Sequence, residues 1–217
     1  VGSEMCIRDR VSLRSEDWLY KMFGIDAELL IDHAWGYETC RMSDIKNYHS
    51  EEHSLSNGQV LMRNYSFDEA LVIVREMTDN LVLDLFEKGL VTSSLTLWIA
   101  YDHRYEHEAS KGTVKLERES NSSKKIIDAV KDLYLRIADR YTGIRRIEVC
   151  ANRVAPESYV QYSLFDDPKQ TDKERHLQEA VLNVKQRYGK NAIMRGSNLL
   201  ECSTYRERNE QIGGHRA

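Results

Sequence analysis

Three pairs of adjacent acidic residues are the first places in this chain to look for catalytic chemistry: Glu51-Glu52, Asp68-Glu69 and Asp166-Asp167. Two-metal phosphoryl transfer needs carboxylates on a rigid element, close enough together to bridge two Mg²⁺ ions. The first pair falls in an expected linker and the third in a loop. The second lies in the first turn of an expected helix, where the helix dipole alone favours acidic residues. Because phosphate-loop, G-x-G-x-x-G and G-x-S-x-G motifs are also absent from the sequence, we expect no catalytic residue in this chain.

Two histidine pairs have a spacing compatible with metal binding, His49-x-x-x-His53 and His103-x-x-x-His107. Both pairs fall in expected loops, and neither a cysteine nor a second pair is placed to complete a site. The sequence therefore predicts no metal site.

Basic residues mark a second kind of chemistry, the binding of phosphates. Arg145 and Arg146 begin one expected strand and Arg153 follows on it, while Lys115 and Arg118 lie on another. Residues 122–124, Ser-Ser-Lys, come at the expected start of a helix, where free backbone N–H groups favour a phosphate. Together these groups would hold a DNA backbone without reading its bases. An ordinary solvated face accounts for the same residues equally well.

A third feature is the stretch "VQYSLFDDPKQ", Val160 to Gln170, which sets Leu164 and Phe165 in polar surroundings. A short peptide with Gln161 ahead of two apolar residues can dock by inserting those residues into a pocket while the amide makes directed hydrogen bonds. The alternative is that Leu164 and Phe165 fold back and cap their own domain.

The elements that must position these residues are clearest between residues 54 and 158. Strands are predicted at 54–65, 92–101, 113–118 and 144–154 from their alternating pattern. A helix opens at the capping-box pair Ser66 and Glu69 and closes at Gly89, and a second runs from residue 122 or 123 to Gly143. The order β-α-β-β-α-β predicts an α+β domain, with a four-stranded antiparallel-type sheet covered by two helices on one face.

The same alternation predicts which side chains face the helices and which do not. Apolar positions of the helices and strands should form the core; they are Ala70, Ile73, Val74, Met77, Leu81, Leu85, Leu95, Leu97, Ile99, Val114, Leu116, Ile127, Val130, Tyr134, Ile137, Tyr141, Ile147, Val149 and Ala151. The opposite, open face should carry Thr96, Trp98, Lys115, Arg146, Gln59 and Arg63. An antiparallel sheet can leave such a face in water.

The flanking segments are shorter or less regular. Residues 1–10 show no periodicity and resemble translated adapter sequence, so we expect a non-native or unstructured leader, with the true chain starting further upstream. Short helices are predicted at 15–24 and 26–36, each ended by glycine, and a linker at 37–53. A helix with a capping-box pair at Thr171 and Glu174 follows, with Leu177, Val181, Val184 and Tyr188 as its apolar stripe, and then a loosely ordered basic tail.

Bulk composition is that of a soluble, helix-rich protein, with 41% hydrophobic and 30% charged residues. No apolar run approaches the roughly 20 residues of a membrane span, and no signal peptide is visible. The net charge of −4 gives no overall attraction to nucleic acid, so any such contact requires a local basic face. The four cysteines are far apart and form no C-x-x-C pair, which favours a reducing, cytoplasmic location; they are Cys6, Cys40, Cys150 and Cys202.

Four of these segments together resemble the C-terminal part of the Y-family DNA polymerases. They are "LSNGQVLMRNY" entering a helix, "QYSLFDDP" after the last strand, a charged helix, and the terminal "RNEQIGGHRA". The most similar branch is the UmuC-type or UV-damage-repair polymerases of Gram-positive bacteria, near DNA polymerase IV. The resemblance runs from Val11 to Ala217. It implies the end of the thumb at 11–36, a tether at 37–53, the little-finger DNA-binding domain at 54–158, a sliding-clamp-binding peptide at 159–170, and a C-terminal amphipathic helix and basic tail at 171–217.

The resemblance also implies partners and the residues that would bind them. Template-primer DNA would be held through Ser56, Asn57, Gln59, Arg63, Lys115, Arg118, Arg146 and Arg153. The sliding clamp (beta subunit) would be bound by Gln161, Ser163, Leu164 and Phe165. Tyr162 stands where the family more often has leucine, so weaker clamp binding is expected.

The parent protein implied by this resemblance is an error-prone translesion DNA polymerase of SOS-type lesion bypass and DNA repair, which uses two Mg²⁺ ions. Its palm and fingers precede the thumb and are not in this chain. The fragment is therefore expected to need no cofactor, to be inactive alone, and to act in the cytoplasm without membrane contact. The alternative is a free-standing DNA-binding adaptor that tethers a partner to the sliding clamp. The reading frame upstream of Val11 distinguishes the two, because a palm with acidic residues on strands supports the first.

Overall fold

The computed structural model describes residues 4–47, 53–102, 104, 107–158, 167–212 and 215–216. The chain divides into two compact units, Val1–Glu51 and Glu52–Ala217. The segment Gln161–Phe165, predicted to bind a clamp, lies outside the described residues, as do His49 and His103. No helix in the described part of the chain is long and apolar enough to cross a membrane.

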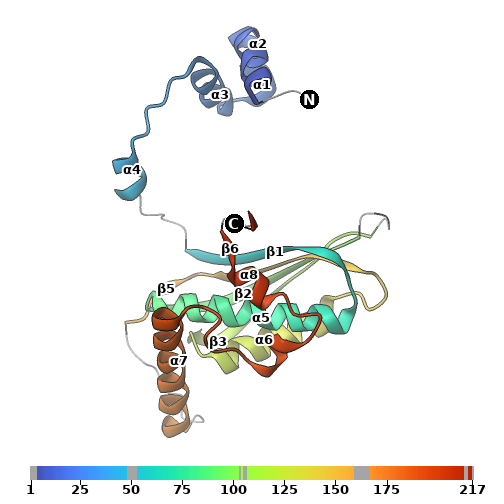
Figure 1. Ribbon diagram of the computed structural model, residues 1–217, viewed down its shortest axis with the longest axis vertical. Helices are drawn as coiled ribbons and strands as arrows, with labels where there is room; N and C mark the ends of the chain where they lie inside the picture. The colour runs from blue at the N-terminus through green and yellow to red at the C-terminus, as the bar shows by residue number, and fades with distance from the viewer. Residues whose placement is uncertain are drawn as a thin grey trace. The chain divides into compact units, whose positions relative to one another are not determined.

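The first unit consists of short helices, α1 (Glu4–Ser12), α2 (Glu16–Phe23), α3 (Asp26–Trp35) and α4 (Met42–Asn47) (Figure 1). The predicted ends of α2 and α3 are confirmed, since Gly24 and Gly36 follow them with positive φ angles of 59° and 81°, which glycine adopts without strain. Two expectations about this unit differ from the structure. Most of the segment expected to be an unstructured leader is helical in α1, and the expected linker contains α4.

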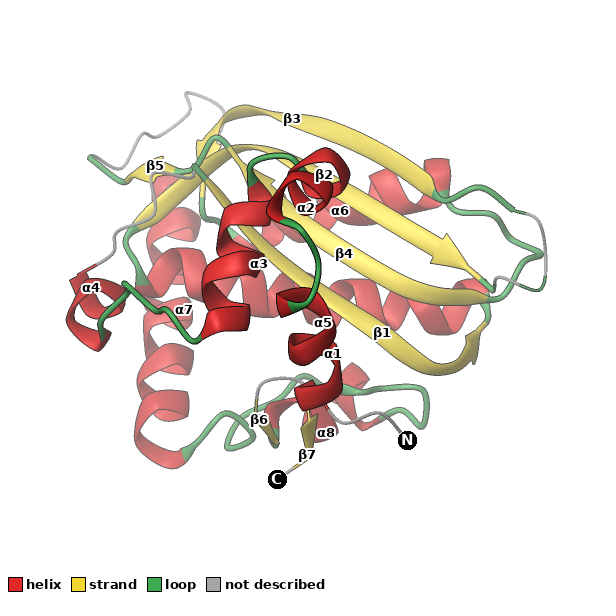
Figure 2. Ribbon diagram, turned by 90° about the horizontal axis from the view of Figure 1, so that it is seen from above, coloured by secondary structure: helices red, strands yellow, loops and turns green. Residues whose placement is uncertain are grey.

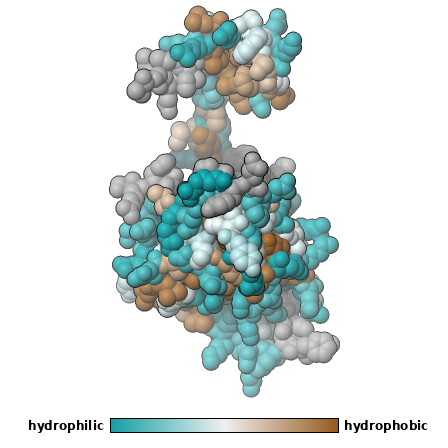
Figure 3. Space-filling model, turned by 90° about the vertical axis from the view of Figure 1, so that its right-hand side faces the viewer, coloured by the Kyte–Doolittle hydropathy of each residue, from teal (hydrophilic) through white to brown (hydrophobic). Residues whose placement is uncertain are grey.

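The first unit has little interior of its own. Leu19 and Ala27 are its buried apolar residues among those described, whereas Trp18, Phe23 and Trp35 are 45%, 48% and 67% exposed. Apolar atoms accordingly appear at the surface of these helices in Figure 3.

The second unit is an antiparallel sheet with helices on one face (Figure 2). Its strands are β1 (Ser54–Tyr65), β2 (Leu90–Tyr101), β3 (Ser110–Ser120) and β4 (Ile144–Asn152), in the order β1-β4-β2-β3, and β5 (Ala155–Pro156) pairs with the start of β2. Helices α5 (Phe67–Glu87) and α6 (Ser123–Ile137) both pack on the same face of the sheet. The predicted β-α-β-β-α-β order and α+β class are confirmed.

Local signals explain why α5 and α6 begin where they do. The Ser66 side chain accepts the backbone N–H of Glu69 while the Glu69 carboxylate accepts the N–H of Ser66, which completes the predicted capping box. Ser122, one of the two predicted caps, accepts the N–H of Lys125 at the start of α6. Leu95, Leu97 and Ile99 of β2, and their counterparts on β4, are fully buried between the sheet and the two helices.

Some predictions within this domain are wrong. The second helix ends at Ile137 rather than near Gly143, and Tyr141 is 96% exposed instead of belonging to the core. Gln59 pairs with the buried Ile147 in the register of β1 and β4, so its side chain lies on the helix side of the sheet and not on the open face. A sheet's side chains alternate with a period of two, and Asn57 therefore shares that helix side.

The C-terminal part folds onto the same domain. It comprises α7 (Pro168–Tyr188), a 3-10 turn η1 (Gly196–Leu199), α8 (Tyr205–Asn209), and the short strands β6 (Gln211–Ile212) and β7 (His215–Arg216). The tail expected to be loose is packed in its described part, since Tyr205 is only 5% exposed.

Helix α7 also departs from its predicted pattern. It is capped by Asp167 with Pro168 at its first position, and not by Thr171. Leu177 and Tyr188 are 63% and 68% exposed, whereas the buried side chain of this helix is Gln178. Only part of the predicted apolar stripe therefore packs, since Val181 and Val184 are half-buried.

Candidate nucleic-acid interface

The face of the sheet opposite α5 and α6 is polar and carries a hydrogen-bonded row across three strands. Asn152 of β4 donates from Nδ2 to Thr96 Oγ1 of β2 at 2.8 Å. The hydroxyl of Thr96 lies 2.9 Å from that of Thr113 on β3, and Cys150 Sγ lies 3.3 Å from Asn152 Oδ1. These contacts link polar side chains of β2, β3 and β4 across the centre of the open face.

Cations surround an aromatic side chain on this open face. The Arg146 guanidinium carbon lies 5.1 Å from the ring centroid of Trp98, and its Nη2 lies 3.7 Å from Glu148 Oε2. Lys111 is the β3 partner of Trp98, and Lys115 is the partner of Ser94, so both lie on the same face. Both lysines are exposed. The ring and the carboxylate orient the Arg146 guanidinium while half of its side chain stays open to solvent.

The open face contains three of the eight predicted DNA-binding residues. Ser56 pairs with Cys150 and Arg146 pairs with both Val60 and Ala100, which places them with Lys115 on this face. Arg118 is exposed beyond the register shift that separates the Ser94–Lys115 pair from the Thr92–Ser120 pair. Arg153 follows β4 with a left-handed φ of 50° and is exposed.

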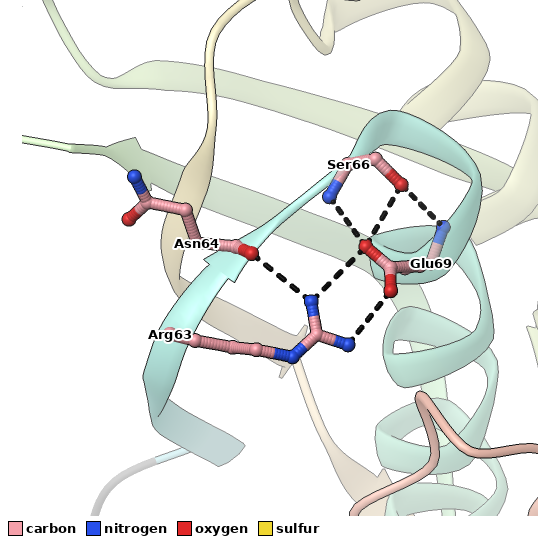
Figure 4. A network of polar contacts seen from close by, with 4 residues as sticks. All are labelled: Arg63, Asn64, Ser66 and Glu69. Atoms are coloured by element: carbon pink, nitrogen blue, oxygen red, sulfur yellow. Dashed lines mark hydrogen bonds and ion pairs between the residues drawn. The ribbon is translucent and has the colours of Figure 1, made fainter.

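Arg63 is engaged elsewhere, in an ion pair at the start of α5 (Figure 4). Its Nη2 lies 2.7 Å from Glu69 Oε1, and its Nη1 donates to Glu69 Oε2 and to the Asn64 carbonyl. The Arg63 guanidinium, followed by the N–H and hydroxyl of Ser66, holds the pKa of Glu69 down at about 2. The expectation that Arg63 belongs to the open face is wrong, because it pairs with a carboxylate on the helix side.

Asn57 and Gln59 are also engaged on the helix side. Arg208 of α8 donates to Asn57 Oδ1, and Asn57 Nδ2 donates to the Met77 carbonyl at 3.3 Å. Gln59 Nε2 donates to Thr204 Oγ1 at 3.0 Å. These two predicted DNA contacts therefore bind the C-terminal part of the same chain.

The predicted phosphate site at the start of α6 contains a carboxylate of this chain. Glu174 Oε1 of α7 accepts the Ser122 hydroxyl and the Lys124 backbone N–H, each at 2.9 Å. A carboxylate at a helix N-terminus makes the same hydrogen bonds that a phosphate would make there. Phosphate binding at this place would require Glu174 to move away.

Lys111, Glu148 and Asn152 of the open face were missed by sequence reasoning. The sequence does contain a signal for Lys111, because residues 111, 113 and 115 are two apart and therefore share one face of a strand. Because the strand was predicted to start only at Thr113, Lys111 was assigned to a loop. Glu148 and Asn152 lie two and six residues after Arg146 on the same strand, so the alternation places them on the same face.

No three His, Cys, Asp or Glu side chains lie close enough to hold a metal ion, within the part of the chain that the structure describes. In the acidic pair Asp68-Glu69, Glu69 forms an ion pair with Arg63, and Asp167 caps α7. These carboxylates do not fit a two-metal centre, and no step of a metal-assisted reaction is assigned to them.

The fold and this face together define the class of protein: a C-terminal α+β domain with one helix-covered and one open, partly cationic sheet face. Residues 52–164 match the impB/mucB/samB family C-terminal domain. The chain therefore belongs to the impB/mucB/samB family, and its resemblance to the Y-family DNA polymerases is confirmed.

Two individual proteins are similar to parts of this chain. DNA polymerase IV 2 of Bacillus subtilis (strain 168) is 25% identical over 203 residues, which cover 92% of this chain and 47% of that protein. The chain thus spans about half the length of this curated relative. A solved structure titled Y-family DNA polymerase chimera Dbh-Dpo4(243-245)-Dbh is 16% identical, with a TM-score of 0.39, and the match covers 72% of this chain and 46% of that chain.

Proposed function

We propose that this chain binds the backbone of template-primer DNA on its open sheet face, as the C-terminal part of a translesion DNA polymerase that acts in DNA damage tolerance. The observation that carries the proposal is the placement of Lys111, Lys115 and the Trp98-supported Arg146 together on that face. Hydroxyl and amide groups lie between these cations. Such groups bind phosphate and sugar without selecting a base sequence. The family match supports the same partner.

The matched test replaces equal charge on two faces of the same domain. One variant carries Lys111→Gln, Lys115→Gln and Arg146→Gln. The control carries Lys88→Gln, Lys131→Gln and Arg136→Gln, three exposed cations on or beside the helices. Fluorescence anisotropy with two primer-template duplexes of unrelated sequence should show weaker binding for the first variant, by the same factor on both duplexes, and little change for the control. Equal losses in the two variants would reject the open face as the binding surface.

The segment with Gln161, Ser163, Leu164 and Phe165 is proposed to bind a sliding clamp. The ordered residues on either side support this proposal. Glu157 is held by Arg175 through a bidentate ion pair at 2.7 and 2.8 Å, and Asp167 caps α7. A docking peptide between two anchored ends loses less conformational freedom on binding than a free tail would.

A pair of double variants tests clamp binding. Leu164→Ala with Phe165→Ala should abolish binding to an immobilised clamp and leave the melting temperature unchanged. Leu199→Ala with Leu200→Ala is the control, because it also removes two adjacent apolar side chains, 67% and 51% exposed. A large fall in melting temperature in the first variant would instead favour the alternative in which Leu164 and Phe165 cap their own domain.

Polymerase activity itself is proposed for the larger protein and not for this chain. The described carboxylates of this chain do not fit a two-metal centre, as shown above for Glu69 and Asp167. A primer-extension assay with the purified chain, Mg²⁺ and all four nucleotides should show no incorporation. Incorporation by this chain alone would contradict the assignment.

A further inference from the structure

The outer side of α5 carries a row of acidic residues that meets the C-terminal part of the chain. Glu76 and Asp79 contact residues 189–209, here called the strap, and Glu87 contacts α7. Asp84, one turn before Glu87, is close enough to Lys190 and Arg208 to attract both. The strap therefore meets α5 through opposite charges and hydrogen bonds.

The strongest of these contacts is an ion pair that spans two helices. Arg195 Nε lies 2.6 Å from Asp79 Oδ2, and its Nη2 donates to Asp79 Oδ1 at 2.8 Å and to Ser123 Oγ of α6 at 3.2 Å. The Asp79 side chain is 16% exposed. Because the pair is bidentate and partly shielded from water, it stabilises docking more than an exposed pair would.

Glu76 fixes the position of the strap on α5 through a buried hydrogen bond. Its side chain is 3% exposed, and its Oε2 accepts the backbone N–H of Thr204 at 3.3 Å. Its Oε1 is buried without a hydrogen-bond partner among the described residues. Burial raises the pKa of Glu76, while Ser203, Thr204, Asn198 and the positive charge of Arg208 oppose that rise. A carboxylate buried in this way is costly unless the strap supplies partners.

The strap is also bound to α7. Lys185 Nζ of α7 donates to the hydroxyl of Tyr205 at 2.5 Å and lies 5.0 Å from the Tyr205 ring centroid. Gln186 donates to Glu87 of α5 at 2.8 Å. The end of α7 is thus held on α5 partly through the strap.

The first half of α7, as far as Gln178, is held by a second group of polar contacts. Glu174 accepts from Ser122 and Lys124 of α6, and Gln178 donates to the Asn121 carbonyl at 3.1 Å. Arg175 pairs with Glu157. Polar side chains therefore make the hydrogen bonds and ion pairs that hold α7 on the domain.

Beside these contacts α7 borders an open groove, whose lining on this helix runs from Gln170 to Lys185. A groove of about 910 Å³ lies among α5, α6, α7 and the strap, with Val82, Ile127 and Val181 among its lining residues. Protein interiors are close-packed. A helix that borders such a groove makes fewer apolar contacts with its domain, so less free energy is needed to detach it. Polar contacts beside an open groove are the features of an element that can detach without unfolding the sheet.

We propose that residues 189–209 are a releasable latch that keeps α7 docked on α5 and α6, with Arg195 and Arg208 as its charged contacts. In the latched state Glu174 covers the start of α6, and Asn57 and Gln59 are occupied. Release would free these groups together with the walls of the groove.

Hydrogen exchange of the full chain, followed by mass spectrometry, tests the latch without DNA or clamp. Arg208→Ala and Arg195→Ala should each raise the exchange rates of α7 and the strap at least tenfold, with the rates of β1, β2 and β4 unchanged. Arg206→Ala is the matched control on α8, because it also removes an arginine side chain but one that is exposed. Unchanged exchange in α7 after both substitutions would overturn the latch.

Charge exchange separates a latch from general damage to the fold. Asp79→Arg combined with Arg195→Asp restores the ion pair with reversed polarity and should bring the exchange of α7 back toward the wild-type rate. If the single variants instead speed exchange throughout the sheet, the strap is an integral part of the core and the proposal fails. In the wild-type protein, 1 M NaCl should speed exchange in α7 and the strap more than in the sheet, because salt screens the contacts that hold them; equal acceleration would also contradict a latch.

Discussion

A guanidinium that is bound at close range by both oxygens of a carboxylate has fewer groups left for nucleic acid, and Arg63 shows how the sequence can mislead. It lies in a motif that resembles the DNA-contacting family, yet the structure pairs it with Glu69 (Figure 4). Arg146 also has an acidic neighbour, but at 3.7 Å and beside an aromatic ring that orients it toward the open face. The difference between these two arginines is one of strand parity and could not be read from residue type.

The Glu69 network predicts a particular pH dependence of stability. The pKa of Glu69 is lowered to about 2 in the folded protein, from an ordinary value of about 4.3. Because the folded pKa is the lower one, the stabilisation is present above about pH 5 and is lost as the pH falls toward 2. Glu69→Gln should therefore reduce the loss of unfolding free energy between pH 5 and pH 3 in urea titrations. The same loss in wild type and variant would show that the network contributes nothing.

The cap residue of the same network has its own expected effect. Ser66→Ala removes the acceptor for the Glu69 N–H and should lower the free energy of unfolding by about 1 kcal/mol. Ser56→Ala serves as a control, since Ser56 lies on the open face of β1 and not at a helix start. Equal effects of the two substitutions on urea-induced unfolding would contradict the role of Ser66 as a cap.

Trp98 is expected to act on DNA through Arg146. Trp98→Ala removes the ring 5.1 Å from the guanidinium, and an exposed cation–π contact contributes about 0.5–1 kcal/mol. DNA affinity should fall by roughly two- to fivefold. In an Arg146→Gln background the same substitution should have less effect. An equal loss in both backgrounds would mean that Trp98 contacts DNA independently.

At the scale of elements, the sequence predicts those parts whose signals are local. The capping box of α5 and the alternation of β2 and β4 are confirmed, since each depends on residues within a few positions. β1 was only partly predicted, because its polar Asn57 and Gln59 face the helices, where distant strap residues bind them. The packing of α7 was only partly predicted for the same reason. Gln178 and Glu174 form hydrogen bonds with residues 121–124 around the start of α6, which are far away in sequence.

The close approach of α6 to β3 depends on a glycine. A Cβ at Gly112 would lie 2.8 Å from Leu133 Cδ1 and 3.0 Å from Ile137 Cγ2. Gly112→Ala should destabilise the domain by about 1–3 kcal/mol, because overpacking forces the helix to shift. Gly58→Ala is the control, since its nearest neighbour would be Glu148 Cγ at 3.7 Å. If thermal unfolding shows equal effects, α6 has more room than the structure gives it.

At the scale of the whole molecule, the chain has a net charge of −4, yet its open sheet face holds Lys111, Lys115 and Arg146 together, with Glu148 beside Arg146. The acidic residues of α5 lie on the other side of the domain and are engaged by the strap and α7. Overall composition therefore hides a local separation of charge. That separation, and not the net charge, is what the proposed DNA binding uses.

The salt dependence of DNA binding tests this account most directly. Each phosphate neutralised on duplex DNA contributes a slope of about −0.9 in a plot of log affinity against log salt concentration. Replacing Lys111, Lys115 and Arg146 by Gln should make that slope shallower by roughly 3, and the control with Lys88, Lys131 and Arg136 replaced should keep the wild-type slope. A wild-type slope in the open-face variant would contradict the central claim that this face of the sheet holds the DNA backbone.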